Sequence, residues 1–328
     1  MLVLSGALLL GFLVLFKSAD WFVIGSVATA RNLDVSPMAI GLTVVALGTS
    51  APEIFVAIAS SLRGQPEIAV GNAIGSNSAN IGLVLGVTAL IAPLPFRAEI
   101  IKNDLPVLIF VTLCAGATLI DYQLGIWDGL LLALALALFL FRLTLPPDKP
   151  LGPDGIDYVA EISELGEIPG MATPRALMLL AIALVLLLLS SELLVWAASR
   201  IAINLGIGEL VIGLTVIAVG TSLPELVVSI TSALKKQPDL AIGNIVGSNI
   251  FNLLAVLTIP AVMAPAEFSA EILWRDYGVM LLLTVLLVTF AYSGSGQGRV
   301  GRVKGSVLVV LWVGYLLHLY HASPGNQA

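Results

Sequence analysis

The sequence predicts an all-α, polytopic membrane protein with ten transmembrane helices arranged as two inverted five-helix repeats. Two observations support this fold class. Hydrophobic residues make up 58% of the 328 residues and charged residues only 11%, which lies far outside the composition of a soluble globular domain. The second half of the chain also repeats the first half in register.

Apolar runs along the whole chain are long enough to cross a membrane, which takes about 20 residues in a helix. Backbone polar groups in lipid need internal partners, so only helices and closed barrels can span a bilayer. The alternating segments of a membrane barrel are absent from the sequence, and we therefore expect helices. The ten predicted spans are residues 1–30, 38–62, 68–92, 104–121, 125–143, 174–203, 208–233, 240–264, 277–293 and 304–321.

An offset of 172 residues relates the two halves without a gap. GLTVVALGTSAPE at 41–53 and GLTVIAVGTSLPE at 213–225 are identical at ten of thirteen positions, and GNAIGSNSAN at 71–80 recurs as GNIVGSNIFN at 243–252. The predicted units are a first repeat at 1–143 with its motifs at 41–80, an acidic cytoplasmic connector at 144–173, and a second repeat at 174–328 with its motifs at 213–252.

Five spans per repeat is an odd number, so the second copy enters the membrane with the opposite orientation. Such inverted repeats are typical of secondary transporters, which bind their substrate near the midplane between the repeats. The distribution of Lys and Arg over the short connections places both termini outside and the acidic connector in the cytoplasm. We do not expect the apolar start to be a removable signal, because residues 18–30 have a counterpart in the middle of the chain.

Glu53 and Glu225 are the first candidate site residues, because each lies deep in a predicted span. A carboxylate there costs about 2.5–3.5 kcal/mol or more. A bound cation would offset this cost, since a hard ion such as Ca2+ takes roughly six to eight oxygen ligands. The alternative is a protonated or hydrogen-bonded structural glutamate, but two symmetry-related copies favour a cation site.

Each glutamate follows a threonine, a serine and a proline of the same motif. These are Thr49, Ser50 and Pro52 in the first copy and Thr221, Ser222 and Pro224 in the second. The threonine lies on the glutamate's helical face. The proline lacks an N–H, so we expect a bend and free carbonyl oxygens at Gly48 and Gly220. The alternative for the hydroxyls is a bond to the preceding helical turn.

The second motif places an amide, a hydroxyl and an amide on one face of an otherwise apolar helix. The residues are Asn72, Ser76 and Asn80, mirrored by Asn244, Ser248 and Asn252. Their oxygens can bind Na+ or Ca2+ without adding charge, so the two glutamates would set a total charge that suits one divalent ion. The alternative, also open for Asn77 and Asn249, is hydrogen bonding between helices that glycines bring close together.

Several function classes are disfavoured. The predicted cavity has carboxylates but no Lys, Arg or His, which favours a metal cation over an anion. The sequence has no basic patch of the kind that binds nucleic acid, so we do not expect a nucleic-acid partner. We also expect no cofactor and no required oligomeric partner. A passive channel would need a continuous pore, and an enzyme would need a nucleophile with a base or a metal-binding His cluster. For Asp20 and Glu192, near the ends of spans 1 and 6, we prefer an interfacial or packing role.

The duplicated motifs resemble those of the cation/Ca2+ exchanger superfamily, whose paired α-repeats carry G-T-S-x-P-E and G-N-x-x-G-S-N. The resemblance covers all ten spans and is strongest to prokaryotic Na+/Ca2+ exchangers, which implies a prokaryotic cytoplasmic membrane. It also implies a compact site between spans 2, 3, 7 and 8, with spans 1 and 6 moving across it. The implied ion ligands are Glu53, Glu225, Thr49, Thr221, Ser50, Ser222, Ser76, Ser248, the carbonyls of Ala46 and Ala218, and Asn80 and Asn252 at the centre.

The expected function is therefore antiport, in which Na+ and Ca2+ compete for the same carboxylates in alternating inward- and outward-open states. Asn252 stands where some relatives, including K+-dependent exchangers, have Asp. The resemblance thus implies exchange coupled to Na+ without K+. Protonation would also neutralise the glutamates, so Ca2+/H+ exchange remains the alternative.

Overall fold

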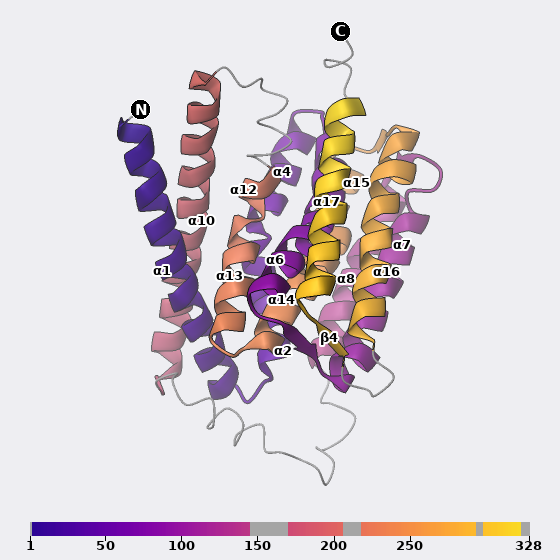
Figure 1. The fold of residues 1–328 in the computed structure, drawn as a ribbon. Helices are drawn as coiled ribbons and strands as arrows, with labels where there is room; N and C mark the ends of the chain where they lie inside the picture. The colour runs from indigo at the N-terminus through magenta and orange to yellow at the C-terminus, as the bar shows by residue number, and fades with distance from the viewer. Residues whose placement is uncertain (1, 145–169, 206–217, 293–297, 323–328) are drawn as a thin grey trace.

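The computed structural model describes residues 2–144, 170–205, 218–292 and 298–322. In this part of the chain, eight helices are long and apolar enough to cross a membrane. A ninth candidate is a pair of helices at 37–49 and 51–62, bent by 43° at a short break. The bend predicted for the second span is confirmed, and Figure 1 shows the helices packed into one bundle.

The first half contains helices with several π-helical turns, which are labelled η. Its elements are α1 (Leu2–Asn32), α2 (Pro37–Ile40), η1 (Gly41–Val45), α3 (Ala46–Thr49), α4 (Ala51–Leu62), α5 (Pro66–Ala79), η2 (Asn80–Leu85), α6 (Gly86–Ile91), η3 (Ile100–Asp104), α7 (Leu105–Ala117) and α8 (Ile126–Thr144). Pro52 is the second residue of α4 and Pro66 is the first residue of α5. At these positions the missing N–H of proline costs no helical hydrogen bond.

The second half repeats this order. Its elements are α10 (Thr173–Asn204), α12 (Ala218–Thr221), α13 (Leu223–Leu234), α14 (Pro238–Phe251), η5 (Asn252–Val256), α15 (Thr258–Met263), η6 (Ile272–Tyr277), α16 (Gly278–Ala291) and α17 (Arg302–Ala322). Adding 172 to the bounds of α3, α4 and α5 gives the bounds of α12, α13 and α14. The sequence repeat is thus also a repeat of secondary structure. Two predicted features, most of the connector and the start of the seventh span, lie outside the described residues.

Two short antiparallel β pairs depart from the all-α prediction. β1 (Leu94–Phe96) pairs with β4 (Gly298–Val300), and β2 (Gln123–Leu124) pairs with β3 (Ala266–Glu267). Each pair joins a connection in the first half to one in the second half. Backbone groups between helices have no helical partner and pair with each other here. Strands of two or three residues are too short for their alternating pattern to be visible in a sequence.

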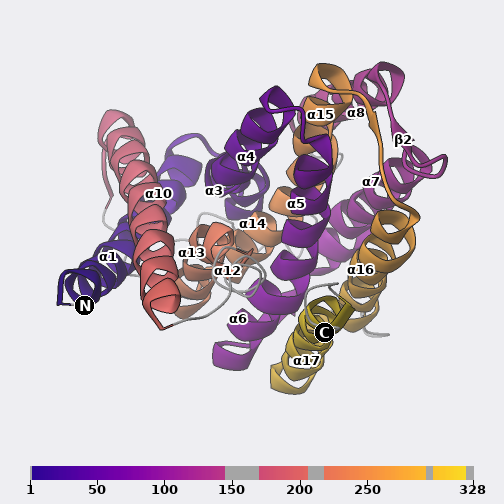
Figure 2. The same ribbon diagram turned by 90° about the horizontal axis from the view of Figure 1, so that it is seen from above.

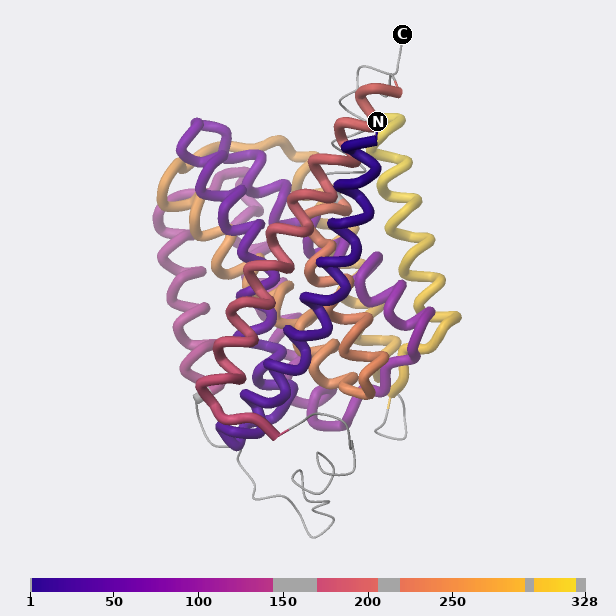
Figure 3. Tube along the Cα trace, turned by 90° about the vertical axis from the view of Figure 1, so that its left-hand side faces the viewer, coloured from indigo at the N-terminus to yellow at the C-terminus, as the bar shows by residue number. Residues whose placement is uncertain are grey.

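Helices α1 and α10 run antiparallel to each other at one side of the bundle (Figures 2 and 3). A Cβ atom added at Gly11 would lie 2.8 Å from the Leu194 side chain, and one added at Gly25 would lie 3.1 Å from the Cα of Leu180. Later residues of α1 thus contact earlier residues of α10, as expected for antiparallel helices. Together with parts of α2, η1 and α13, the pair forms a hydrophobic cluster separate from the one that joins the other helices.

The repeated motif helices form the buried centre. In the spans Pro66–Ile91 and Pro238–Met263, 72% and 78% of the most apolar stretch is buried, against 17–33% in the other six spans. A Cβ atom added at Gly243 would lie 2.7 Å from the carbonyl oxygen of Met38 and 3.0 Å from the Cα of Gly41. Only glycine allows the backbones of η1 and α14 to approach this closely. This contact brings α3, which follows η1, against the polar face of α14.

Candidate ion-binding site

Each predicted ion-binding glutamate lies in the first turn of a helix that follows a break. Ser50 separates α3 from α4, and Ser222 separates α12 from α13; their ψ angles of 8° and 5° lie outside the α-helical range. Glu53 and Glu225 are three residues further on and are each 1% exposed. The breaks thus place two acidic side chains in the interior, as the sequence predicted.

The carboxyl groups of the two glutamates each accept one hydrogen bond from a predicted ligand. Ser76 Oγ donates to Glu53 Oε1 at 3.2 Å, and Ser50 Oγ donates to Glu225 Oε1 at 3.4 Å. The second bond crosses from the first repeat to the second. Among the described residues, the other carboxyl oxygens, Glu53 Oε2 and Glu225 Oε2, are buried without a hydrogen-bond donor. Two buried acceptors without donors are the arrangement that a cation would satisfy.

Thr49 also reaches across the repeat interface. Its Oγ1 lies 3.0 Å from Asn244 Oδ1 and 3.5 Å from Ser248 Oγ. Two oxygen ligands at right angles around a hard cation, with bonds of about 2.3–2.6 Å, would themselves be about 3.3–3.7 Å apart. The Thr49 and Ser248 hydroxyls therefore have a spacing that one cation could bridge. Ala46, one turn before Thr49, is fully buried beside them.

The second-motif asparagines meet at the centre of the protein. Asn80 Nδ2 donates to Asn249 Oδ1 at 3.2 Å, and Asn77 Nδ2 donates to the Asn249 carbonyl at 3.1 Å. These bonds fit the interhelical role left open for Asn77 and Asn249. Asn80 Oδ1 and both polar atoms of the Asn252 side chain are buried and without partners among the described residues. Asn80 and Asn252 thus keep oxygens available at the centre, and each begins a π-helical segment, η2 and η5.

The carbonyl oxygens are less free than the proline argument predicted. Ser191 Oγ of α10 donates to the Gly220 carbonyl at 2.9 Å, so that oxygen has a partner despite Pro224. The Ala46 carbonyl accepts the Ser50 N–H at 2.9 Å, which leaves it one lone pair for an ion. Two second-half counterparts, Ala218 and Thr221, are the first and last residues of the short helix α12.

The hydroxyl of Ser222, the counterpart of Ser50, is also buried without a partner among the described residues. The six serine and asparagine side chains of the predicted set are all buried: Ser50, Ser222, Ser76, Ser248, Asn80 and Asn252.

The acidic residues of α1 and α10 lie apart from this site. Lys235 Nζ lies 2.7 Å from Asp20 Oδ1, so an ion pair joins α1 to the end of α13. Lys17 is a second, more distant partner at 3.7 Å. Glu192, the counterpart of Asp20, is exposed. These placements agree with the interfacial or packing role that we preferred for both residues.

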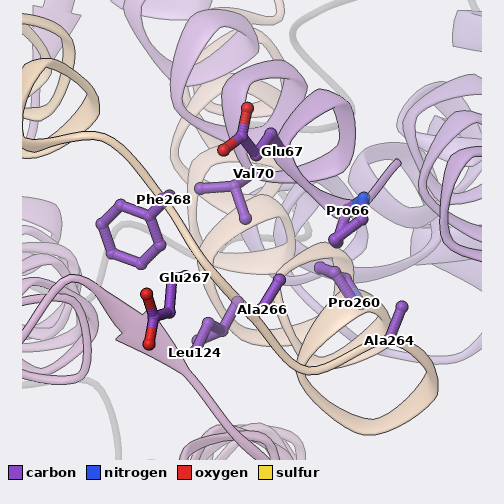
Figure 4. A pocket seen from close by; sticks show the side chains of 9 residues that line it. All are labelled: Pro66, Glu67, Val70, Leu124, Pro260, Ala264, Ala266, Glu267 and Phe268. Carbon is purple, nitrogen blue, oxygen red and sulfur yellow. The ribbon is translucent and has the colours of Figure 1, made fainter. Parts of the chain in front are cut away.

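A small cavity elsewhere does not compete with this site. It lies between the start of α5 and the end of α15, where Glu67 and Glu267 line it among apolar side chains (Figure 4). Its volume of about 10 Å³ is close to the minimum that holds one water molecule. None of the predicted ion ligands lines it.

Two polar residues next to the site were not predicted from the sequence. Ser229 Oγ accepts a hydrogen bond from Asn244 Nδ2 at 3.0 Å, and Ser191 Oγ donates a hydrogen bond to the Gly220 carbonyl. The first-half counterparts of these serines, at an offset of 172, are Ala57 and Ala19. The sequence signal was therefore a serine in one copy only, which a search for repeated residues passes over.

Comparison with known proteins agrees with these observations. The sequence matches the family described as "Sodium/calcium exchanger protein" over residues 3–145 and 175–321. It is 38% identical to the inner membrane protein YrbG of Escherichia coli over 99% of each chain. It is 30% identical to the sodium/calcium exchanger MaX1 of Methanosarcina acetivorans over 96% of this chain and 97% of that protein.

The fold also matches a solved structure. The sodium-calcium exchanger NCX_Mj, soaked with Na+ and Sr2+, superimposes with a TM-score of 0.80 at 32% sequence identity, covering 97% of this chain and 99% of that one. A second structure of the same exchanger, soaked with Na+ and Ca2+, gives the same TM-score. With its buried acidic site and apolar helices, this chain is a multi-pass membrane transporter that belongs to the sodium/calcium exchanger protein family.

Proposed function

We propose that this protein exchanges Na+ for Ca2+ across a membrane by alternating access. The observation that carries the proposal is the pair of buried glutamates, Glu53 and Glu225, each with one carboxyl oxygen that has no donor among the described residues. The relatives named as sodium/calcium exchangers support the choice of ions.

The ion ligands in this proposal are the two glutamates with the hydroxyl, amide and carbonyl oxygens around them. As carboxylates, Glu53 and Glu225 repel each other, and one divalent cation would neutralise both. Several Na+ ions would neutralise them equally well. An empty site with two negative charges would be trapped by its desolvation cost, so only loaded states cross the barrier. Competition for the same carboxylates then couples the two ion fluxes.

The full set of proposed ligands follows the sequence prediction: Glu53, Glu225, Thr49, Thr221, Ser50, Ser222, Ser76, Ser248, Asn80, Asn252 and the carbonyls of Ala46 and Ala218.

Alternating access in this proposal uses ten spans in two inverted repeats. The antiparallel packing of α1 and α10, which are counterparts in the two repeats, supports the inversion. The broken helix α3–α4 and its counterpart α12–α13 would be spans 2 and 7. The start of α1 and the end of α17 lie at the same end of the bundle in Figure 1, which supports two termini on one side. From the distribution of positive charges, we propose that this side is outside.

The choice of Na+ as coupling ion rests on two observations. First, the relatives MaX1 and NCX_Mj are both named as sodium/calcium exchangers. Second, the neutral oxygens of Thr49, Ser248 and Ala46 suit a monovalent ion that lies beside one carboxylate. Neutral Asn252 in place of an acid argues against a K+ site. Ca2+/H+ exchange remains the second candidate, because a proton on each glutamate would also remove the buried charge.

The experiment is 45Ca2+ uptake into proteoliposomes of defined composition. Vesicles loaded with Na+ and diluted into choline buffer should accumulate Ca2+, and vesicles with equal Na+ on both sides should not. Glu53→Gln and Glu225→Gln should each abolish this uptake. Glu67→Gln, which removes an exposed carboxylate at the start of α5, is the matched control and should transport normally.

Each result decides between the candidates. Uptake that follows a pH gradient and ignores Na+ would replace the proposal with Ca2+/H+ exchange. Uptake that needs neither gradient would identify a channel and refute antiport.

A further inference from the structure

A chain of three hydrogen-bonded side chains leads from α13 to the proposed ion site. Asn244 Nδ2 donates to Ser229 Oγ at 3.0 Å, and Thr49 Oγ1 lies 3.0 Å from Asn244 Oδ1. All three residues are 0% exposed. The chain links one helix turn of α13, the face of α14 and the end of α3, so it crosses from the second repeat to the first.

The neighbours of Asn244 fix which way its amide points. Asn244 Nδ2 lies 3.4 Å from the backbone carbonyl of Glu225, and a carbonyl can only accept a hydrogen bond. The atom on this side of the amide is therefore the nitrogen. The amide oxygen consequently faces Thr49. Since that oxygen can only accept, the Thr49 hydroxyl is the donor in the 3.0 Å bond to Asn244.

This direction matters for a cation ligand. A hydroxyl has one proton and two lone pairs, and it binds a cation through a lone pair. With the proton directed at Asn244, the lone pairs of Thr49 Oγ1 are available on the side where Ser248 Oγ lies at 3.5 Å. Two other acceptors compete for the Thr49 proton: the Ala46 carbonyl at 3.4 Å, which is a longer contact, and the carboxyl group of Glu225. Giving the proton to Asn244 also leaves that carbonyl for an ion.

The same chain cannot form in the first repeat. The counterpart of Ser229 is Ala57, which has no hydroxyl to accept from Asn72, the counterpart of Asn244. The support is therefore built for one of two otherwise repeated positions. It acts on Thr49 and so on the group of neutral oxygens formed by Thr49, Ser248 and the Ala46 carbonyl.

We propose that Ser229 and Asn244 are positioning residues that hold the Thr49 hydroxyl with its lone pairs directed at a Na+ subsite. The inference rests on the proposed exchange function for its physiological meaning, and it concerns binding that can be measured without transport. Apart from one carboxylate, the ligands of this subsite are neutral oxygens, so Na+ is the ion most affected. Ca2+, which takes its charge compensation from Glu53 and Glu225, depends less on the direction of one hydroxyl.

The test is ion-dependent thermal stabilisation of the purified full chain, because an ion that binds the folded state raises its melting temperature with concentration. Ser229→Ala should raise the half-stabilising Na+ concentration about three- to tenfold, the size of effect expected for losing one buried hydrogen bond. The Ca2+ value should change less than twofold. In exchange assays, the same variant should raise the KM for Na+ and leave the maximal rate within twofold.

Ser232→Ala is the matched control. Ser232 lies on the same helix, is equally buried, and has no hydrogen-bond partner among the described residues. We expect its Na+ dependence to equal that of the unaltered protein. Ser229→Thr keeps the hydroxyl and should restore Na+ binding to within twofold, which a general packing defect would not allow. Melting temperatures without ions show whether each variant is folded.

A Ser229→Ala protein with unchanged Na+ dependence would overturn the inference, and so would equal losses for Na+ and Ca2+. Equal effects of Ser229→Ala and Ser232→Ala would overturn it as well. Failure of the exchange function is separate, since it would appear as absent Na+-driven Ca2+ uptake in the unaltered protein while the binding comparison still gives its answer.

Discussion

Replacing either glutamate with glutamine should produce a protein that is more stable without ions and unable to be stabilised by Ca2+. Glu53 and Glu225 are each 1% exposed, and among the described residues one oxygen of each carboxyl group, Oε2, has no hydrogen-bond donor. A charged carboxylate in the membrane interior costs about 2.5–3.5 kcal/mol. Glutamine has the same shape and no charge, so we expect a gain in ion-free stability of this order.

The repulsion between the two carboxylates adds to the gain, because removing one charge relieves the other. The same substitution removes half of the negative charge that binds a divalent ion. Stability and ion binding should therefore change in opposite directions. Loss of a supporting residue lowers stability and function together, so the opposite signs distinguish an ion ligand from a structural glutamate.

The assay compares melting temperatures in Na+-free choline buffer with and without Ca2+. The unaltered protein should gain stability with Ca2+, while Glu53→Gln and Glu225→Gln should start higher and gain little. Glu67→Gln should behave like the unaltered protein. A glutamine variant that melts at a lower temperature without ions, or that retains the full Ca2+ effect, would refute the assignment of that glutamate.

Three further outcomes follow from the packing and charges. Gly243→Ala places a methyl group 2.7 Å from a backbone oxygen of α2 and should cost about 1–3 kcal/mol, seen as a lower melting temperature, whereas Gly314→Ala meets nothing within 4 Å and should not. Lys235→Met removes the ion pair between Lys235 and Asp20. Both side chains are about one-third exposed, and exposed ion pairs contribute little, so Na+-driven exchange should change less than about fivefold. Complete loss of exchange would contradict this expectation. Asn252→Asp adds a buried carboxylate and should lower ion-free stability by up to about 3 kcal/mol, with recovery in Ca2+; unchanged melting would show that position 252 is solvated.

The repeat explains why so much of the fold was visible in the sequence. Apolar runs of about 20 residues located the spans, and the offset of 172 placed Glu53 and Glu225 at equivalent positions of α4 and α13. Proline in each motif predicted the bend beside Ser50. These features depend on local chemistry or on the comparison of two copies, and both are present in a single sequence.

Other features depend on how helices are rotated and brought together. The bond between Asn244 and Ser229 forms because α13 and α14 turn these side chains toward each other, and helix rotation has no local signature. The Gly220 carbonyl gains a partner from α10, whose serine has no counterpart in α1. The β pairs join connections that lie far apart in the chain. Composition and spacing carry no information on such contacts.

The two halves of the site differ for two separate physical reasons. Asn77 and Asn80 have identical counterparts in Asn249 and Asn252, yet Asn80 donates to Asn249 while the Asn252 amide has no partner among the described residues. Identical residues with unequal bonds show that this asymmetry comes from conformation, so a change of conformation can reverse it.

The second asymmetry is a difference in sequence: Ser229 in the second repeat corresponds to Ala57 in the first. It therefore does not depend on conformation. In the proposed exchange, the first asymmetry would let the two halves swap roles as access alternates. The sequence difference makes the two flanking oxygen groups chemically unequal. Asn244 beside Thr49 has the Ser229 hydroxyl as an acceptor, whereas Ala57 offers none to Asn72, the counterpart of Asn244.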